Sequence, residues 1–187
     1  FWTYTHGQFG LTNNASPGFI TIPHADHLTL KRGTWETVFT PGLTIKGSGY
    51  VAKPLGLVGR NSAPVNDNYS AVIFPTGNLA FSRQPTAGGS MLLLSETDTW
   101  FSDQTYHAAF SAGDEQNTMA IDQTVEPATS GDPGGFGGSQ NAALYLGSFD
   151  NASGYFNGTL FEYRLMSRVL EPDEYLRQIP VQAYMSN

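Results

Sequence analysis

The stretch that decides the fold is YFNGTLFEYRLMSRVL, residues 155–170. The Asn-Gly pair at 157–158 predicts a tight turn, because these residue types tolerate the positive φ that such turns require. Residues 160–165 alternate between two faces of a predicted strand, and one face is partly polar because it carries Leu160, Glu162 and Arg164. The segment therefore predicts a turn that leads into a long strand near the end of the chain.

A short helix is predicted shortly after this strand, between Glu171 and Gln178. Pro172 suits the first helical position, where its missing N–H is not needed. The acidic residues around it suit a helix N-terminus, where the backbone dipole favours negative charge. We expect one or two helical turns there and almost no helix elsewhere.

Short runs of β-branched and aromatic residues recur along the rest of the chain, separated by Gly, Pro, Asn, Asp and Ser, and this pattern predicts strands. Pro75-Thr76-Gly77 predicts a tight hairpin loop between two of them. Many short strands with little helix predict an all-β fold, a two-sheet antiparallel β-sandwich of jelly-roll type. The predicted strands are 19–22, 35–39, 56–59, 70–74, 78–81, 91–94, 106–110, 118–121, 143–146 and 160–165.

Length and composition limit the class of protein. A chain of 187 residues, 40% hydrophobic and 13% charged, predicts one ordered domain over residues 1–187. The net charge of −7 leaves no basic patch for nucleic acid, and no run approaches the roughly 18 apolar residues that membrane insertion requires. Zero cysteines exclude disulfides and thiolate metal sites. The first residue is Phe rather than Met, which favours a piece of a longer protein.

Several segments follow one another in an order typical of a known group of domains. They are GFITIP at 18–23, Trp35 to Phe39, QTYHAAF at 104–110, LYLGS at 144–148, YFNGTL at 155–160 and LEPDEY at 170–175. Together they resemble laminin-G-like and pentraxin-like domains of the concanavalin A-like lectins and glucanases. Asp122-Gln123 departs from the Asp-Gly that these domains usually carry, which leaves the type of that turn open. The resemblance covers nearly the whole chain and implies a concanavalin A-like jelly roll.

A catalytic site is not predicted. Retaining glycosidases of this superfold need two carboxylates on one strand, about 5 Å apart, and no Glu-x-Asp-x-Glu or similar strand motif occurs. No Ser lies in a Gly-x-Ser-x-Gly elbow. A polysaccharide-degrading enzyme is therefore the least favoured of three alternatives.

Two Asp-Asn pairs suggest a metal site. Calcium takes six to eight oxygen ligands from carboxylates, amides and carbonyls. Asp67-Asn68 precedes a predicted strand and Asp150-Asn151 follows another, and their places resemble the calcium loops of pentraxins. This resemblance implies Ca²⁺ at Asp67, Asn68 and Asp150, although pentraxins have more carboxylates in the second loop. Asp103 is a rival ligand, because calcium-binding laminin-G domains carry an Asp there, and all these residues are also common turn formers.

Aromatic side chains beside loops are candidates for sugar binding, because saccharides stack on aromatic faces while nearby polar groups bind their hydroxyls. The candidates are Trp100, which with Phe101 lies in the polar stretch from Ser95 to Gln104, together with Tyr69, Tyr155 and Asn151. Core packing is the alternative for each ring, since most of the 12 Phe, 9 Tyr and 3 Trp must fill the core.

The favoured function is a non-catalytic recognition module, carbohydrate-binding or adhesive, in an extracellular or virion-surface protein. Its expected partner is a glycan or a surface protein. The alternative is a structural or assembly domain of a viral or surface particle, in which residues 1–4 and 179–185 pack on partner chains of a homo-oligomer or larger assembly. Shared fold alone does not decide between them.

Overall fold

The computed structural model of the chain describes residues 9–11, 19–25, 28, 32–48, 55–62, 65–84, 91–113, 117–127, 142–148 and 154–175. In this part of the chain the strands are β1 Phe9–Leu11, β2 Ile20–Ile22, β3 Gly33–Pro41, β4 Ile45–Lys46, β5 Leu55–Ser62, β6 Val65–Ile73, β7 Leu79–Gln84, β8 Met91–Leu94, β9 Thr99–Trp100, β10 Tyr106–Ala112, β11 Asn117–Ile121, β12 Thr124–Glu126, β13 Leu144–Leu146 and β14 Gly158–Met166. A 3₁₀ turn, Pro172–Glu174, follows them. No helix among these residues is long and apolar enough to cross a membrane.

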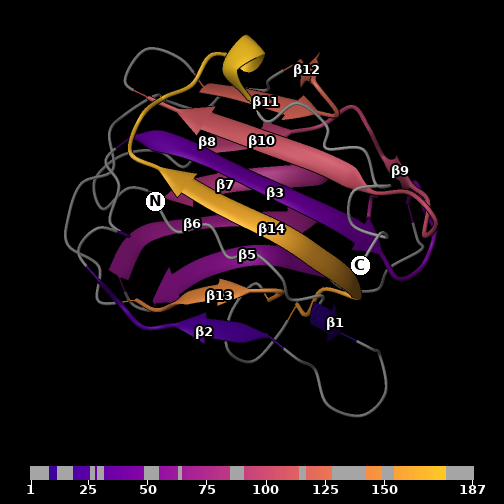
Figure 1. Ribbon diagram of the computed structural model, residues 1–187, viewed down its shortest axis with the longest axis horizontal. Helices are drawn as coiled ribbons and strands as arrows, with labels where there is room; N and C mark the ends of the chain where they lie inside the picture. Colours follow the sequence, from indigo (N-terminus) through magenta and orange to yellow (C-terminus); the bar gives the residue numbers. More distant parts are fainter. Residues whose placement is uncertain are drawn as a thin grey trace, which may run out of the picture.

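The strands form two antiparallel layers, as the all-β sandwich prediction requires (Figure 1). The first, sheet A, has the order β1-β14-β3-β10-β11-β12, and the second, sheet B, has the order β2-β13-β5-β6-β7-β8. A two-stranded ribbon of β4 and β9 lies at the right-hand end of the view. The last predicted strand, β14, lies inside sheet A between β1 and β3, so it closes the sandwich as expected.

Aromatic rings fill the space between the layers. Trp35 from β3 packs against Tyr69 and Phe81 of sheet B, with ring centroids 5.3 and 5.1 Å apart. Phe81 in turn stacks on Phe110 of β10 at 4.8 Å. Each of these four side chains has at most 2% of its surface exposed. Burial of rings of this size is the main source of stability in a chain without disulfides.

All ten predicted strands are present, with boundaries that differ by a few residues. The predicted loop at Pro75-Thr76-Gly77 joins β6 to β7, where Gly77 N donates to the Phe74 carbonyl at 2.9 Å. Four strands were not predicted: β1, β4, β9 and β12. Each has only two or three residues, too few to show an alternating pattern.

The Asn157-Gly158 pair is not the tight turn that the sequence predicts. Gly158 is the first residue of β14, with a φ of 155°, and the Asn157 carbonyl accepts from Gly42 N at 2.8 Å. A Cβ on Gly158 would lie 2.3 Å from the Thr40 carbonyl oxygen. Glycine is therefore needed here for the close approach of two strands.

The predicted alternation in β14 is also interrupted. The register against β3 shifts between Leu160 and Glu162, which makes Phe161 the extra residue of a β-bulge. Leu160 consequently lies in the core together with Tyr163 and Leu165, while Glu162 and Arg164 occupy the opposite face. A sequence pattern does not reveal a bulge, because the inserted residue has no characteristic type.

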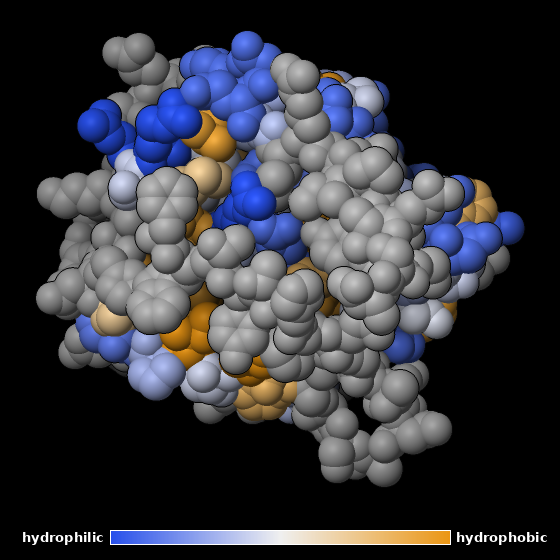
Figure 2. Space-filling view, viewed as in Figure 1, coloured by the Kyte–Doolittle hydropathy of each residue, from blue (hydrophilic) through white to orange (hydrophobic). Residues whose placement is uncertain are grey.

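The C-terminal turn lies on the outer face of sheet A, the face seen in Figure 1, where hydrophilic residues gather in Figure 2. Leu170 and Tyr175 pack on Ala109 and Ala120, two small residues of β10 and β11. Hydroxyl groups hold the turn. Ser111 donates to the Leu170 carbonyl at 2.8 Å, Thr34 accepts from Leu170 N at 2.9 Å, and Thr118 bonds the Tyr175 hydroxyl at 2.5 Å. Pro172 starts the 3₁₀ turn, as expected.

The hairpin from β11 to β12 resolves the turn type left open above. Asp122 and Gln123 have φ values of 49° and 70°, and Ile121 pairs with Thr124 across them. Two positive φ values in a two-residue hairpin loop are typical of a type I′ turn. The Asp122 carboxylate also accepts from His107 N at 2.8 Å, which ties the turn to β10.

Three loops interlock beside the β4–β9 ribbon. Gly47 N donates to the Asp98 carbonyl at 3.0 Å, and a Cβ on Gly77 would lie 2.2 Å from that same oxygen. The Trp100 indole Nε1 donates to the Gly77 carbonyl at 2.6 Å. The loops after β4, β6 and β8 are therefore fixed to one another at this end of the sandwich.

Candidate functional site

Three aromatic rings meet at the edge of sheet B, and we call them the edge cluster: Phe19, Tyr145 and Tyr155. Phe19 stacks on Tyr155 with centroids 5.8 Å apart and planes at 23°, and Tyr145 meets Phe19 edge-on at 5.8 Å. All three side chains are partly exposed. The cluster thus presents aromatic surface to solvent, which is the resource that saccharide binding uses.

The strand pattern explains why Tyr145 faces outward. Leu144 and Leu146, its neighbours in β13, turn toward the core, so Tyr145 takes the opposite face. It pairs with Thr21 of β2 and with Gly59 of β5. A glycine on one side leaves the tyrosine ring unshielded there.

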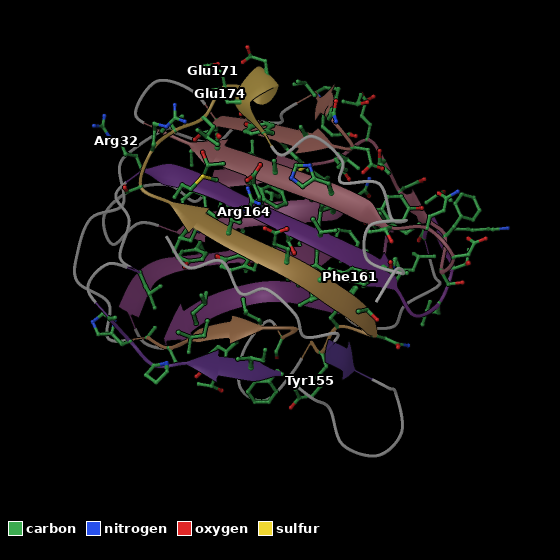
Figure 3. The ribbon with its side chains drawn as sticks, viewed as in Figure 1. Arg32, Tyr155, Phe161, Arg164, Glu171 and Glu174 are labelled. Carbon is green, nitrogen blue, oxygen red and sulfur yellow. The ribbon has the colours of Figure 1, made fainter. Side chains whose placement is uncertain are left out.

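Backbone contacts fix Tyr155 in position beside the start of β2, where Figure 3 labels it. Tyr155 forms isolated bridges with Gly56 and Ser148. The next residue, Phe156, is buried and meets Phe39 edge-on at 5.7 Å. Because a core ring follows it directly, Tyr155 is presented on a rigid support.

Trp100 does not have the position that its predicted ligand-binding role requires. Its side chain is 0% exposed and packs against Phe39 at 5.6 Å and Tyr106 at 5.0 Å. A ring without exposed surface has no face for a sugar. Core packing, the alternative considered for each aromatic residue, applies here.

Tyr69 is likewise a core residue. Its side chain is 2% exposed and contacts the Trp35 ring from the inner face of β6. The ligand-binding role predicted for it is therefore corrected too. Tyr155 is the predicted ring that remains at the surface, and Asn151 lies outside the described residues.

The predicted calcium ligands are only partly placed. Asp103 is exposed in the turn before β10. Asp67 and Asn68 lie within β6, but their side chains are outside the described part, as is all of Asp150. Among the described residues no three His, Cys, Asp or Glu side chains gather as a metal site would need. Calcium therefore stays a prediction.

Phe101 presents a second exposed aromatic surface, in a turn that we call the tip, residues 101–104. Phe101 is 39% exposed, while its neighbour Trp100 points into the core. Ser102, Asp103 and Gln104 are exposed as well. The Trp100-Phe101 pair was a candidate from the sequence, but the residue types do not indicate which ring faces outward.

Two carboxylates on the outer face of sheet A, those of Glu36 and Glu162, lie beside basic side chains. The imidazole Nε2 of His107 lies 3.4 Å from a Glu36 carboxylate oxygen, and both side chains are buried. Arg164, in the middle of this face in Figure 3, donates to Glu162 at 2.5 Å. A buried charge requires a partner of this kind. Each carboxylate faces a basic group, unlike the two carboxylates that flank a glycosidase cleft.

Comparisons with known proteins identify the fold. No protein-family model matches the chain, and no curated protein matches its sequence. A carbohydrate-binding module, CBM40, of the Ruminococcus gnavus IT-sialidase, bound to α2,6 sialyllactose, matches with a TM-score of 0.61 at 14% identity, over 78% of this chain and 82% of that one. Mouse laminin α1 domains LG4-5 match with a TM-score of 0.60 at 16% identity, over 90% and 44%. A heptameric SAP-like pentraxin from Limulus polyphemus matches with a TM-score of 0.57 at 13% identity, over 88% and 76%.

These similarities confirm the predicted concanavalin A-like jelly roll, shared with a carbohydrate-binding module, laminin LG domains and a pentraxin. At sequence identities of 13–16%, these matches show a shared fold and do not show what this chain binds. Two of the three edge-cluster rings, Phe19 and Tyr145, were missed as site residues. Tyr145 was open to prediction, because it lies between two leucines in a strand; Phe19 carries no such signal.

Proposed function

We propose that the protein is a non-catalytic carbohydrate-binding module that recognises a glycan through the edge cluster. The observation that carries this proposal is the meeting of three partly exposed rings at one sheet edge. Aromatic faces bind the apolar face of a pyranose, and the Tyr hydroxyls at their rims add polar contacts. Apolar rings of this size would otherwise be expected inside the core.

The fold supports this proposal. Its structural neighbours include carbohydrate-binding modules and lectin-like domains, one of them bound to α2,6 sialyllactose. Glycan recognition in turn suggests an extracellular or particle-surface setting and a role in adhesion. The alternative of an assembly domain rests on residues 1–4 and 179–185, which lie outside the described part of the chain.

Calcium is proposed as an accessory of the same module, at Asp67, Asn68 and Asp150 or at Asp103. A cation that binds only the native state raises the melting temperature by mass action. Melting the protein with calcium and with chelator tests this. An identical melting temperature under both conditions removes calcium from the proposal.

A glycan array followed by titration calorimetry tests the edge cluster. Tyr155→Ala removes one ring, and we expect glycan affinity to fall about three- to ten-fold, the loss of one aromatic contact of about 0.5–1.5 kcal/mol. Tyr155→Phe is the matched control, because it keeps the ring and should retain most of the affinity. The proposal fails if no glycan binds, or if Tyr155→Ala binds its glycan as tightly as the original protein.

A further inference from the structure

The tip is a rigid turn whose shape does not depend on Phe101 being buried. Gln104 N donates to the Phe101 carbonyl at 3.1 Å, which closes the turn. The Thr44 hydroxyl accepts from Ser102 N at 3.2 Å and joins the tip to the loop after β3. Below the tip, Ile45 pairs with Trp100 in the β4–β9 ribbon. Backbone and hydroxyl hydrogen bonds, rather than packing of the Phe101 ring, thus fix the shape of the tip.

Tyr106 contributes two of the hydrogen bonds that hold the tip in place. Its hydroxyl accepts from Phe101 N at 2.8 Å and donates to the Gln104 side chain at 3.1 Å. Burial raises the pKa of Tyr106 above its ordinary value, so the hydroxyl keeps the proton that it donates. Its ring packs on Phe39 and Trp100 in the core. The tip therefore has fixed geometry before any ligand arrives, which lowers the entropic cost of binding.

Phe101 differs from the other exposed apolar residues. In the described part of the chain the large hydrophobic side chains classed as exposed are Leu92 at 38%, Phe101 at 39% and Val125 at 50%. Leu92 and Val125 lie within strands, whereas Phe101 is the one aromatic ring and stands on a turn. Three exposed polar residues follow it in the turn, namely Ser102, Asp103 and Gln104. A fixed ring with hydrogen-bonding groups around it is a contact site for a saccharide.

The charge of the tip selects among saccharides. The exposed charged residues of the tip and its ribbon are Lys46, Asp98 and Asp103, and the whole chain carries −7. Two carboxylates against one ammonium leave a small negative excess at the tip, which disfavours carboxylated or sulfated sugars, since like charges meeting across an interface are repelled. Neutral sugars have no such cost.

We propose that the tip is a second saccharide-contact site, separate from the edge cluster, in which Phe101 stacks on a neutral sugar and Ser102, Asp103 and Gln104 bind its hydroxyls. Core rings connect their supports, since Phe39 contacts both Phe156, next to Tyr155, and Trp100, next to Phe101. A glycan long enough to reach both sites would be held more tightly than at either site alone.

Affinity gel electrophoresis on a panel of neutral and sialylated polysaccharides, with calorimetry on the retained ones, tests this inference. Phe101→Ala should weaken binding of a neutral glycan about three- to ten-fold, while Phe101→Trp should keep it. Leu92→Ala is the matched control, because it removes an apolar side chain of equal exposure and should change nothing. Melting temperatures of all variants check that the fold is intact.

The outcomes separate the two sites. The tip site is refuted if neutral glycans bind the Phe101→Ala variant as tightly as they bind the Leu92→Ala variant. It is also refuted if the protein binds only sialylated glycans, or no glycan at all. Binding that depends on Phe101 but not on Tyr155 supports the tip and refutes the edge cluster. Binding that depends on Tyr155 alone does the reverse.

Discussion

Replacement of Trp100 distinguishes a core anchor from a ligand contact. The indole is fully buried, contacts Phe39 and Tyr106, and donates to the Gly77 carbonyl at 2.6 Å. Trp100→Ala leaves a cavity, which typically costs about 3–5 kcal/mol of unfolding free energy. Trp100→Phe keeps most of the packing but leaves the Gly77 carbonyl without its donor, at a cost of about 1–3 kcal/mol.

These costs convert into melting temperatures. A domain of 150–250 residues loses about 2–4 °C for each kcal/mol, so Trp100→Ala should lower the melting temperature by roughly 6–20 °C and Trp100→Phe by roughly 2–12 °C. Scanning calorimetry measures both. Phe101→Ala is the control, because the adjacent side chain is 39% exposed and its loss should cost less than about 1 kcal/mol.

A different ranking would refute the reasoning. If Trp100→Ala melted within a few degrees of Phe101→Ala, the indole could not be the buried anchor described above. If Trp100→Phe lost glycan binding at unchanged stability, the ring would be a ligand contact, as the sequence alone suggested.

Three further predictions follow from backbone geometry and burial. Gln123→Gly should raise stability by about 0.5–1 kcal/mol in urea unfolding, because glycine adopts the φ of 70° without strain; a drop would contradict the turn assignment. Gly158→Ala should destabilise by about 2 kcal/mol or more in the same assay, since the new Cβ would meet the Thr40 carbonyl; a neutral result would rule out the close approach. Burial raises the pKa of Tyr175 above 10, so its contribution to stability is complete below pH 10 and is lost as pH rises through the folded value. Melting scans from pH 9 to 11.5 should show this loss and show less of it in Tyr175→Phe, and equal slopes would speak against the burial.

The fold was predictable because each longer strand has its own local signature. Runs such as 35–39 and 106–110 begin and end with aromatic residues and are followed by turn formers, so each is visible without its neighbours. The ribbon of β4 and β9 was not predictable, because a strand of two residues cannot show an alternating pattern. The bulge at Phe161 depends on the register against β3, which no local pattern contains.

The site was less predictable for a physical reason. In Trp100-Phe101 one ring must face inward and the other outward, but a short strand bounded by polar residues gives no sign of which. Tyr69 shows the same ambiguity, because hydroxyl-bearing rings serve both cores and surfaces. The edge cluster combines residues from three segments, which meet through the pairing of β13 with β2 and through the bridges of Tyr155 with Gly56 and Ser148.

The three-loop interlock at Gly47, Gly77 and Asp98 and the neighbouring tip should differ in how many amino-acid substitutions they tolerate. A side chain at position 77 would meet the Asp98 carbonyl, and Gly47 adopts a φ of 64°, so substitutions of these two glycines should be poorly tolerated. Ser102 and Asp103 are exposed on the tip, outside the interlock. New ligand preferences can therefore arise there by single exchanges, while the architecture underneath is inherited intact.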